Sequence, residues 1–190
     1  MLLRAQTIAT ACCLLLVSSV LLSACGNTKK QGVDEPAREG LALPLDGLDY
    51  NVFITRELNL RIPPDKAYYK GPEPGKGETL YGVFLQVCNR GDKPRQSARE
   101  FTVTDNQGDK FKPTPLPSDD AFAYQPQLLG AGQCIPQAGS VAQLGPTDGA
   151  LLLFKFPVSV TENRPLDLEI DGPSGPVGPK RNKLTFELDL

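Results

Sequence analysis

Residues 78–89 read ETLYGVFLQVCN, and this stretch decides the fold class because its apolar side chains run almost without a break. Alternate positions would share one face of a β-strand: Tyr81, Val83, Leu85 and Val87. The other face would carry Leu80, Phe84, Gln86 and Cys88. A strand that is apolar on nearly both faces is typical of the centre of a sheet or sandwich. We therefore expect a central strand here.

Alternating apolar stretches on both sides of this strand predict further strands, separated by turn residues. They lie at residues 48–54, 58–62, 101–105, 150–156, 166–170 and 184–190. Glycine and proline, at 18 residues each, favour turns over long helices, and no amphipathic helix of useful length is evident. The sequence therefore predicts an all-β fold, an antiparallel β-sandwich of about seven to nine strands.

The N-terminus has the order of a secretory signal peptide. One positive charge, Arg4, precedes an apolar run from about residue 8 to residue 22, and the small residues Ser23 and Ala24 follow. A plain secreted precursor and an uncleaved anchor are the alternatives, although the apolar run is short for a membrane span. We expect a cleaved signal peptide at residues 1–24.

The four residues Leu22-Ser23-Ala24-Cys25 resemble the lipobox of bacterial lipoproteins. The resemblance implies that the lipoprotein signal peptidase recognises Leu22, Ser23 and Ala24 and cuts before Cys25, whose sulfur carries a diacylglyceryl group. Acyl chains such as palmitate hold a domain at a bilayer far better in pairs than singly. We therefore expect lipid anchoring to the cell membrane or outer envelope, with the domain on the extracytoplasmic side.

The segment after Cys25 is polar and contains scarcely any apolar side chain before Leu41. A stretch of this composition cannot bury enough surface to order itself. We therefore expect residues 26–44 to be disordered, so that the lipidated cysteine and its tether span residues 25–45. The sandwich domain would then span residues 46–190.

Two of the five cysteines remain available in the mature domain. Cleavage removes the first two, and the lipid occupies Cys25, which leaves Cys88 and Cys134 in an oxidising compartment. We expect a disulfide between them, which would hold the long proline-rich segment 113–139 against the central strand. Two buried free thiols are the alternative.

Composition limits the chemistry of the chain. The formal net charge of −2 argues against a nucleic-acid partner. Histidine is absent, which excludes Ser–His nucleophile systems, and two thiols are too few ligands for a metal site. We expect no cofactor and no metal.

Three polar features have two interpretations each. The acids of Asp105–Asp109 and Asp119-Asp120 could bind calcium, but the first stretch lacks the spacing of a calcium loop, and β-turns explain both. Tyr68 and Tyr69, in a lysine-containing loop, could form an exposed contact surface or pack against the sheet.

Three segments together resemble the DUF4352 family of bacterial secreted and lipoprotein domains. They are VCNRGDKP at residues 87–94, FTVTDNQG at residues 101–108 and the strand at residues 150–156. The resemblance covers roughly residues 48–170 and implies an immunoglobulin-like sandwich, related to a mycobacterial secreted antigen, without catalytic or binding residues. The long segment 113–139 departs from the family pattern, and the two cysteines are not general to it.

Two hypotheses for function follow from these features. The leading one is a non-catalytic, lipid-anchored module that binds a protein or another envelope component, or acts as an accessory subunit. The alternative is a small carboxylate-dependent hydrolase or carbohydrate-active enzyme, since the separation of acids in space is not visible in a sequence. A pocket with two facing carboxylates of perturbed pKa would favour the enzyme.

Overall fold

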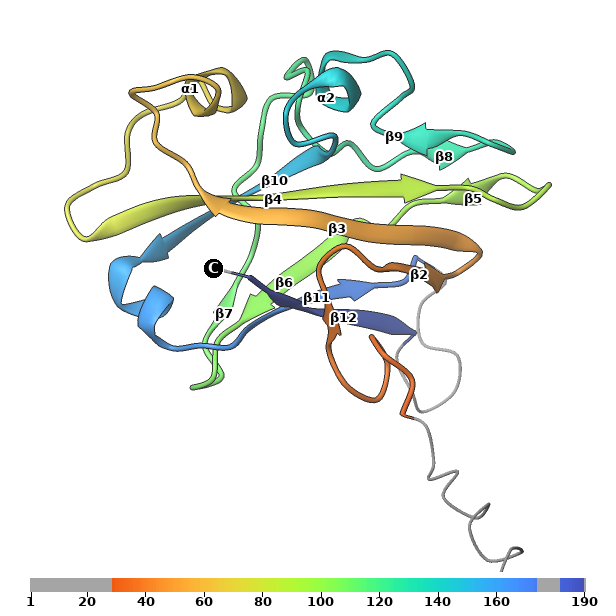
Figure 1. The fold of residues 1–190 in the computed structure, drawn as a ribbon, viewed down its shortest axis with the longest axis horizontal. Helices are drawn as coiled ribbons and strands as arrows, with labels where there is room; N and C mark the ends of the chain where they lie inside the picture. The colour runs from red at the N-terminus through yellow and green to blue at the C-terminus, as the bar shows by residue number, and fades with distance from the viewer. Residues whose placement is uncertain (1–28, 174–181, 190) are drawn as a thin grey trace, which may run out of the picture. The chain divides into compact units, whose positions relative to one another are not determined.

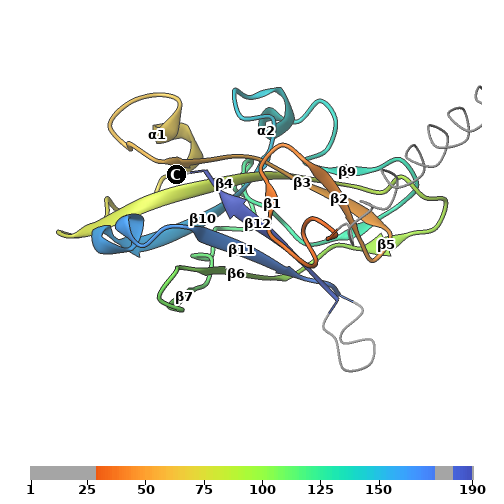
Figure 2. The same cartoon turned by 60° about the horizontal axis from the view of Figure 1, so that its bottom comes forward.

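The structure is a computed structural model that describes residues 29–173 and 182–189. From Gln31 onward the chain forms one structural unit, in which two sheets pack face to face (Figures 1 and 2). The predicted lipidation and cleavage residues, Leu22–Cys25, lie outside the described residues.

The first sheet, here the β4 sheet, has the order β10-β4-β3-β2. Its strands are β2 (Ala42–Leu45), β3 (Leu48–Glu57), β4 (Glu78–Cys88) and β10 (Ala150–Pro157). A two-residue strand, β9 (Cys134–Ile135), pairs with the last two residues of β4, beyond the part of β4 that pairs with β10.

The second sheet, here the β11 sheet, has the order β1-β12-β11-β6-β7. Its strands are β1 (Ala37–Arg38), β6 (Glu100–Thr104), β7 (Lys110–Phe111), β11 (Leu166–Asp171) and β12 (Lys183–Leu188). A separate ribbon pairs β5 (Arg95–Gln96) with β8 (Leu128–Leu129). The helices are short: α1 (Asp65–Tyr68), α2 (Val141–Leu144) and the 3-10 turn η1 (Val158–Glu162).

This architecture confirms the predicted immunoglobulin-like sandwich. Within the described ranges, seven strands have four or more residues, which agrees with the expected number. One strand pair departs from the antiparallel expectation, because β1 pairs with β12 in parallel.

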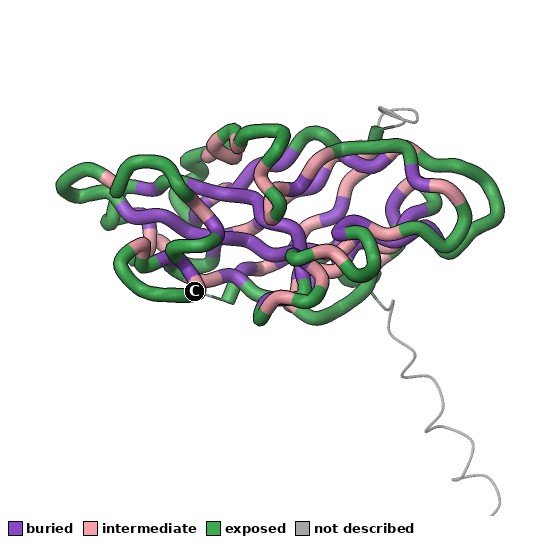
Figure 3. Tube along the Cα trace, turned by 90° about the horizontal axis from the view of Figure 1, so that it is seen from above, coloured by how far each residue is buried: buried purple, intermediate pink, exposed green. Residues whose placement is uncertain are grey.

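The predicted central strand, β4, lies between β10 and β3 and separates two apolar clusters. Its Tyr81, Val83, Leu85 and Val87 belong to the main core between the sheets. On the opposite face, Leu80 and Phe84 join a second cluster. The two faces of β4 are therefore those that its alternation predicted, and each is buried; Figure 3 shows buried positions concentrated along the strands and exposed ones in the loops.

The second cluster lies on the outer face of the β4 sheet and consists of Leu58, Tyr68, Leu80, Phe84, Leu151 and Leu153. Figures 1 and 2 show the α1 and α2 segments on this side of the molecule, away from the β11 sheet. Burial of each large apolar side chain contributes roughly 1.5–3 kcal/mol, so this added layer stabilises the fold substantially.

The tether prediction for residues 25–45 is wrong from Gln31 onward. The Thr185 amide donates to the Gly32 carbonyl oxygen at 2.8 Å, Ala37 is fully buried and pairs with Phe186, and Leu43 pairs with Tyr50. The composition rule failed because this segment adds to sheet edges that already exist, so it needs little apolar surface of its own.

Gly32 shows why this added segment fits closely. Its φ of +77° lies in the left-handed region, and a Cβ there would lie 2.5 Å from a methyl carbon of Leu43. The position therefore requires glycine, and the folded domain begins well before residue 46.

Candidate functional site

Cys88 and Cys134 form the predicted disulfide, with 4.1 Å between their α-carbons. The two residues are direct partners in the pairing of β4 with β9. The bond therefore ties the end of the long irregular segment to the central strand.

Asn89, directly after this bridge, is a buried polar hub that sequence reasoning missed. Its side-chain amide donates to the carbonyl oxygens of Lys93 at 2.8 Å and Leu129 at 2.9 Å. Its Oδ1 accepts from the Gly91 amide at 2.9 Å, so both ends of the side chain are satisfied although it is fully buried. The sequence shows only a turn residue here, because these partners lie up to 40 positions away.

Residues 113–126, here called the strap, cross the free edge of β10. The Thr114 amide donates to the Leu153 carbonyl oxygen at 2.7 Å, and the Tyr124 amide donates to that of Leu151 at 2.9 Å. The Leu151 amide donates back to Phe122. The strap thereby satisfies backbone groups that an open sheet edge would expose.

Two tyrosines bind the backbone of Ala98, just before β6: Tyr50 from β3 and Tyr124 from the far end of the strap. The Tyr50 hydroxyl accepts from the Ala98 amide at 2.8 Å, and the Tyr124 hydroxyl donates to the Ala98 carbonyl oxygen at 2.9 Å. Burial raises the pKa of Tyr50 to about 12 and raises the pKa of Tyr124, whose ring also lies near Tyr50. Both hydroxyls are therefore protonated at neutral pH.

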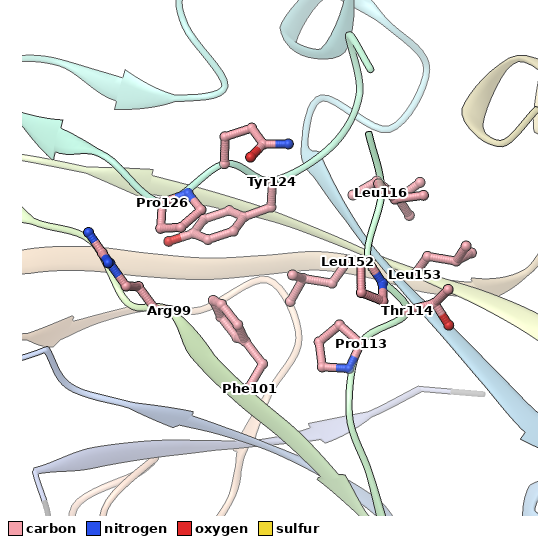
Figure 4. Close-up of a pocket in the computed structure, with 12 residues that line it drawn as sticks. Arg99, Phe101, Pro113, Thr114, Leu116, Tyr124, Pro126, Leu152 and Leu153 are labelled. Carbon is pink, nitrogen blue, oxygen red and sulfur yellow. The ribbon is translucent and has the colours of Figure 1, made fainter. Parts of the chain in front are cut away.

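A hollow of about 210 Å³, here the strap pocket, opens between the strap and β10 (Figure 4). Its walls are strap residues 113–116 and 124–126, together with residues 151–153 of β10. Phe101 and Tyr124 meet edge to face with 5.1 Å between ring centroids, and Arg99 lies at one end of the pocket. The lining is apolar apart from a few side chains.

A second hollow of about 490 Å³, here the helix pocket, lies between the strap and the residues that follow α1. It brings Tyr69 and Lys70 together with Asp119 and Asp120, which are far apart in the sequence. Tyr68 does not join them: it is 1% exposed and contacts the rings of Phe84 and Phe122, each at 4.9 Å between centroids. For Tyr68 the packing interpretation is therefore correct.

Asp105 is a turn residue in the structure. Its Oδ1 accepts from the amides of Gln107 and Asp109, and its Oδ2 accepts from the Asn163 side chain. Burial alone would raise the pKa of Asp105, but these hydrogen bonds outweigh it and lower the pKa. In the part of the chain that the structure describes, no group of three or more Cys, Asp or Glu side chains is arranged to hold a metal ion.

Among the described residues, two carboxylates, Glu39 and Asp167, have a raised pKa, and neither lines the strap pocket or the helix pocket. Burial raises the pKa of Glu39, despite its hydrogen bonds from the amides of Thr55 and Asp189. Burial, and then the charge of Glu187, raise the pKa of Asp167. Among the described residues, the only acids in these two pockets are Asp119 and Asp120, which are adjacent in the chain and do not face each other across a cavity.

No family model matches the chain, and no curated protein matches it. The resemblances to the DUF4352 family and to the lipobox therefore stay predictions. Among the described residues, no helix is both long enough and apolar enough to span a membrane.

Solved structures do show similarity. A functionally unknown protein from Listeria monocytogenes EGD-e has 10% identity and a TM-score of 0.50, covering 80% of this chain and 83% of that one. An uncharacterised β-sandwich protein from Clostridium difficile 630 has 12% identity and a TM-score of 0.47, covering 86% of this chain and 100% of that one.

The candidate lipoprotein ycdA from Bacillus subtilis subsp. subtilis strain 168 has 15% identity and a TM-score of 0.49, covering 78% of this chain. This chain spans only 38% of the Bacillus protein's length. At identities this low, the likeness to the Listeria protein speaks for the fold alone.

Proposed function

We propose that this chain is a lipid-anchored, non-catalytic binding or accessory module of the bacterial cell envelope, and that the strap forms its contact surface. Cys25 carries the lipid and holds the domain at the membrane or outer envelope, on the extracytoplasmic side. The observation that carries the binding role is the strap pocket, a hollow of about 210 Å³ that is walled largely by apolar side chains.

The strap pocket is suited to binding because its walls are held in place on several sides. Thr114 and Tyr124 hydrogen-bond to β10, and the Tyr124 hydroxyl also bonds to Ala98. Pro113, Pro115 and Pro126 restrict the backbone of the remaining wall. A partner therefore meets a surface that needs little ordering, which lowers the entropic cost of association.

In the strap pocket and the helix pocket, the distribution of acids favours this role over the carboxylate-dependent enzyme. Such an enzyme needs two carboxyl groups that face each other across a substrate-sized space. Of the described acids whose pKa is raised, Glu39 and Asp167, neither lines the strap pocket or the helix pocket. Both hollows are instead walled largely by proline, aromatic and aliphatic side chains.

Site-specific photocrosslinking in intact cells tests the binding role. A photoreactive residue at Gln125, in the strap pocket, is expected to capture an envelope component, whereas the same residue at Glu169, on the outer face of β11, is not. Equal yields from both positions, or none from Gln125, would contradict a contact surface at the strap. Lipid anchoring is tested separately by intact mass spectrometry and by Cys25→Ala, which should release the protein from the membrane.

A further inference from the structure

We infer that the strap pocket binds an apolar side chain whose neighbouring carboxylate pairs with Arg99, as in a peptide that presents an aromatic or aliphatic residue beside an acid. The inference rests on the proposed binding role of this pocket and names the chemistry of its ligand. The sequence assigned no role to Arg99, the residue that would pair with the carboxylate.

The size of the strap pocket fits one side chain. Small-molecule and cofactor sites occupy roughly 300–1,000 Å³, whereas an apolar cavity of about 150 Å³ already binds benzene. At about 210 Å³ the strap pocket lies between these values, close to the requirement of a single ring or branched aliphatic group. A side chain that anchors a peptide matches this volume.

The walls favour an apolar group because two of their polar groups, the Tyr124 hydroxyl and the Thr114 amide, already have partners. The Tyr124 hydroxyl donates to Ala98, and the Thr114 amide donates to Leu153. What these walls present to a ligand is the aromatic pair of Phe101 and Tyr124, the side chain of Leu152 and the proline rings. An apolar ligand group forms no hydrogen bonds with water, so it loses none on entering this pocket.

Arg99 supplies the charge. It is exposed and lies at one end of the pocket in Figure 4, and no described residue forms a hydrogen bond or ion pair with it. By contrast, Arg38, Arg56 and Arg61 each pair with a carboxylate. The planar guanidinium of Arg99 is thus available, and its forked donors match the two oxygens of a carboxylate.

The two features together select for a ligand that carries both groups. An apolar group without charge would fill the pocket and leave Arg99 solvated, and a free anion would meet Arg99 without the apolar contact. Either a chain-terminal carboxylate or an Asp side chain beside the anchor could supply the charge. The experiment therefore includes a probe for each source.

The test is a titration of the lipidated protein in detergent micelles, followed by ¹H–¹⁵N chemical shifts. The probes are N-acetyl-L-phenylalanine, its uncharged amide, and N-acetyl-phenylalanyl-aspartate amide. Saturable shifts are expected at the amides of Phe101 and Leu152, with at least one carboxylate probe binding about tenfold more tightly than the uncharged amide, since hydrogen bonds to charged groups are the stronger ones. The probe that shows this preference identifies the source of the carboxylate.

Arg99→Gln should remove that tenfold preference and leave binding of the uncharged amide unchanged. Arg95→Gln is the matched control, because Arg95 is also exposed, has no ion pair among the described residues and does not line the pocket. It should keep the preference.

Equal binding of all probes to the unaltered protein would overturn the inference, as would a preference that survives Arg99→Gln. These outcomes differ from failure of the proposed function. Crosslinking from Gln125 without a carboxylate preference would leave the binding role intact and contradict only the ligand chemistry.

Discussion

The outer faces of the two sheets differ in what covers them. On the β4 sheet, Leu80, Phe84 and Leu151 lie beneath Tyr68 and partly buried Phe122. On the β11 sheet, the outward positions are charged or polar and half exposed: Asp167, Glu169, Lys183, Thr185 and Glu187. Lys183 there forms an ion pair with Glu169 across the two strands.

This difference teaches where a binding site can form in a sandwich. The strands of the β11 sheet alternate strictly, so that face can meet water directly. The nearly continuous apolar sequences of β4 and β10 require a second cover, and the chain supplies it with the α1 segment and the strap. The helix pocket lies where these two covering segments do not meet completely, and the strap pocket lies where the strap crosses β10. The following predictions test whether stability and binding depend mainly on the covered face.

The largest effect should come from removing the disulfide between Cys88 and Cys134, which ties the long irregular segment 113–139 to the central strand. Replacing Cys88 and Cys134 by alanine opens a loop of 46 residues, for which chain entropy gives about 4 kcal/mol of lost stability. Urea unfolding of the variant and of the oxidised protein measures the difference. A loss below about 1 kcal/mol would show that the bridge does not constrain the unfolded chain.

The second effect is a loss of stability at high pH. Burial raises the pKa of Tyr50 from 10.0 to about 12, so the folded protein keeps a proton that the unfolded chain releases. The part of the stabilisation that Tyr50 contributes is complete below pH 10 and is lost as pH rises through its folded pKa, by about 2–3 kcal/mol for this residue. Tyr124, whose pKa burial also raises, adds a loss of the same sign. Urea unfolding between pH 8 and 11.5 measures this loss.

Tyr50→Phe separates titration from hydrogen bonding. At pH 8 it should cost about 1–3 kcal/mol, because the buried Ala98 amide loses its acceptor. Between pH 10 and 11.5 the variant should lose less stability than the unaltered protein. The same slope in both proteins would contradict the assignment to Tyr50.

A smaller effect of opposite sign is expected in the second cluster. The Tyr68 hydroxyl is buried and has no hydrogen-bond partner among the described residues, so Tyr68→Phe should be neutral or stabilise by up to about 1 kcal/mol. Tyr124→Phe is the matched control and should destabilise, since its hydroxyl donates to Ala98. Thermal unfolding of both variants distinguishes the two tyrosines; destabilisation by Tyr68→Phe would reveal a missing partner.

The smallest effect belongs to the exposed face. Asp167 has a raised pKa because of burial and then Glu187, so its charge is unfavourable at neutral pH. Asp167→Asn should stabilise by only a few tenths of a kcal/mol, since solvent screens this half-exposed site. The gain should vanish below the ordinary pKa of 3.8, where the Asp167 carboxyl is protonated in both the folded and the unfolded state. A gain above about 1 kcal/mol would contradict the contrast between the faces.

The sequence predicted those features that depend on local patterns. Alternation placed β4 at the centre and assigned Val83 and Phe84 to opposite faces. Counting cysteines in an oxidising compartment gave the pair of Cys88 and Cys134. Each of these inferences needs only the spacing or number of residues, which the sequence states directly.

The missed features depend on contacts between distant residues. Tyr50 and Tyr124 bind the backbone of the same residue, Ala98, at separations of 48 and 26 positions, and no short motif marks such an arrangement. Arg99 looks like any surface arginine until the strap is placed beside it. Residues 31–45 looked disordered because composition describes a segment alone, without the edges of β3 and β12 to which it adds.

The early start of the fold at Gln31 has a consequence for the reach of the protein. A lipid on Cys25 would be separated by six residues from Gln31, the first described residue with a β-bridge partner. A linker of this length spans at most about 20 Å. A compact domain of this length has a radius of gyration of about 15 Å, so the maximal length of the linker is smaller than the diameter of the domain. A lipid on Cys25 would therefore confine the domain to a thin layer above the lipid headgroups. Membrane-bound partners have a high local concentration in that layer, and partners farther from the membrane are out of reach.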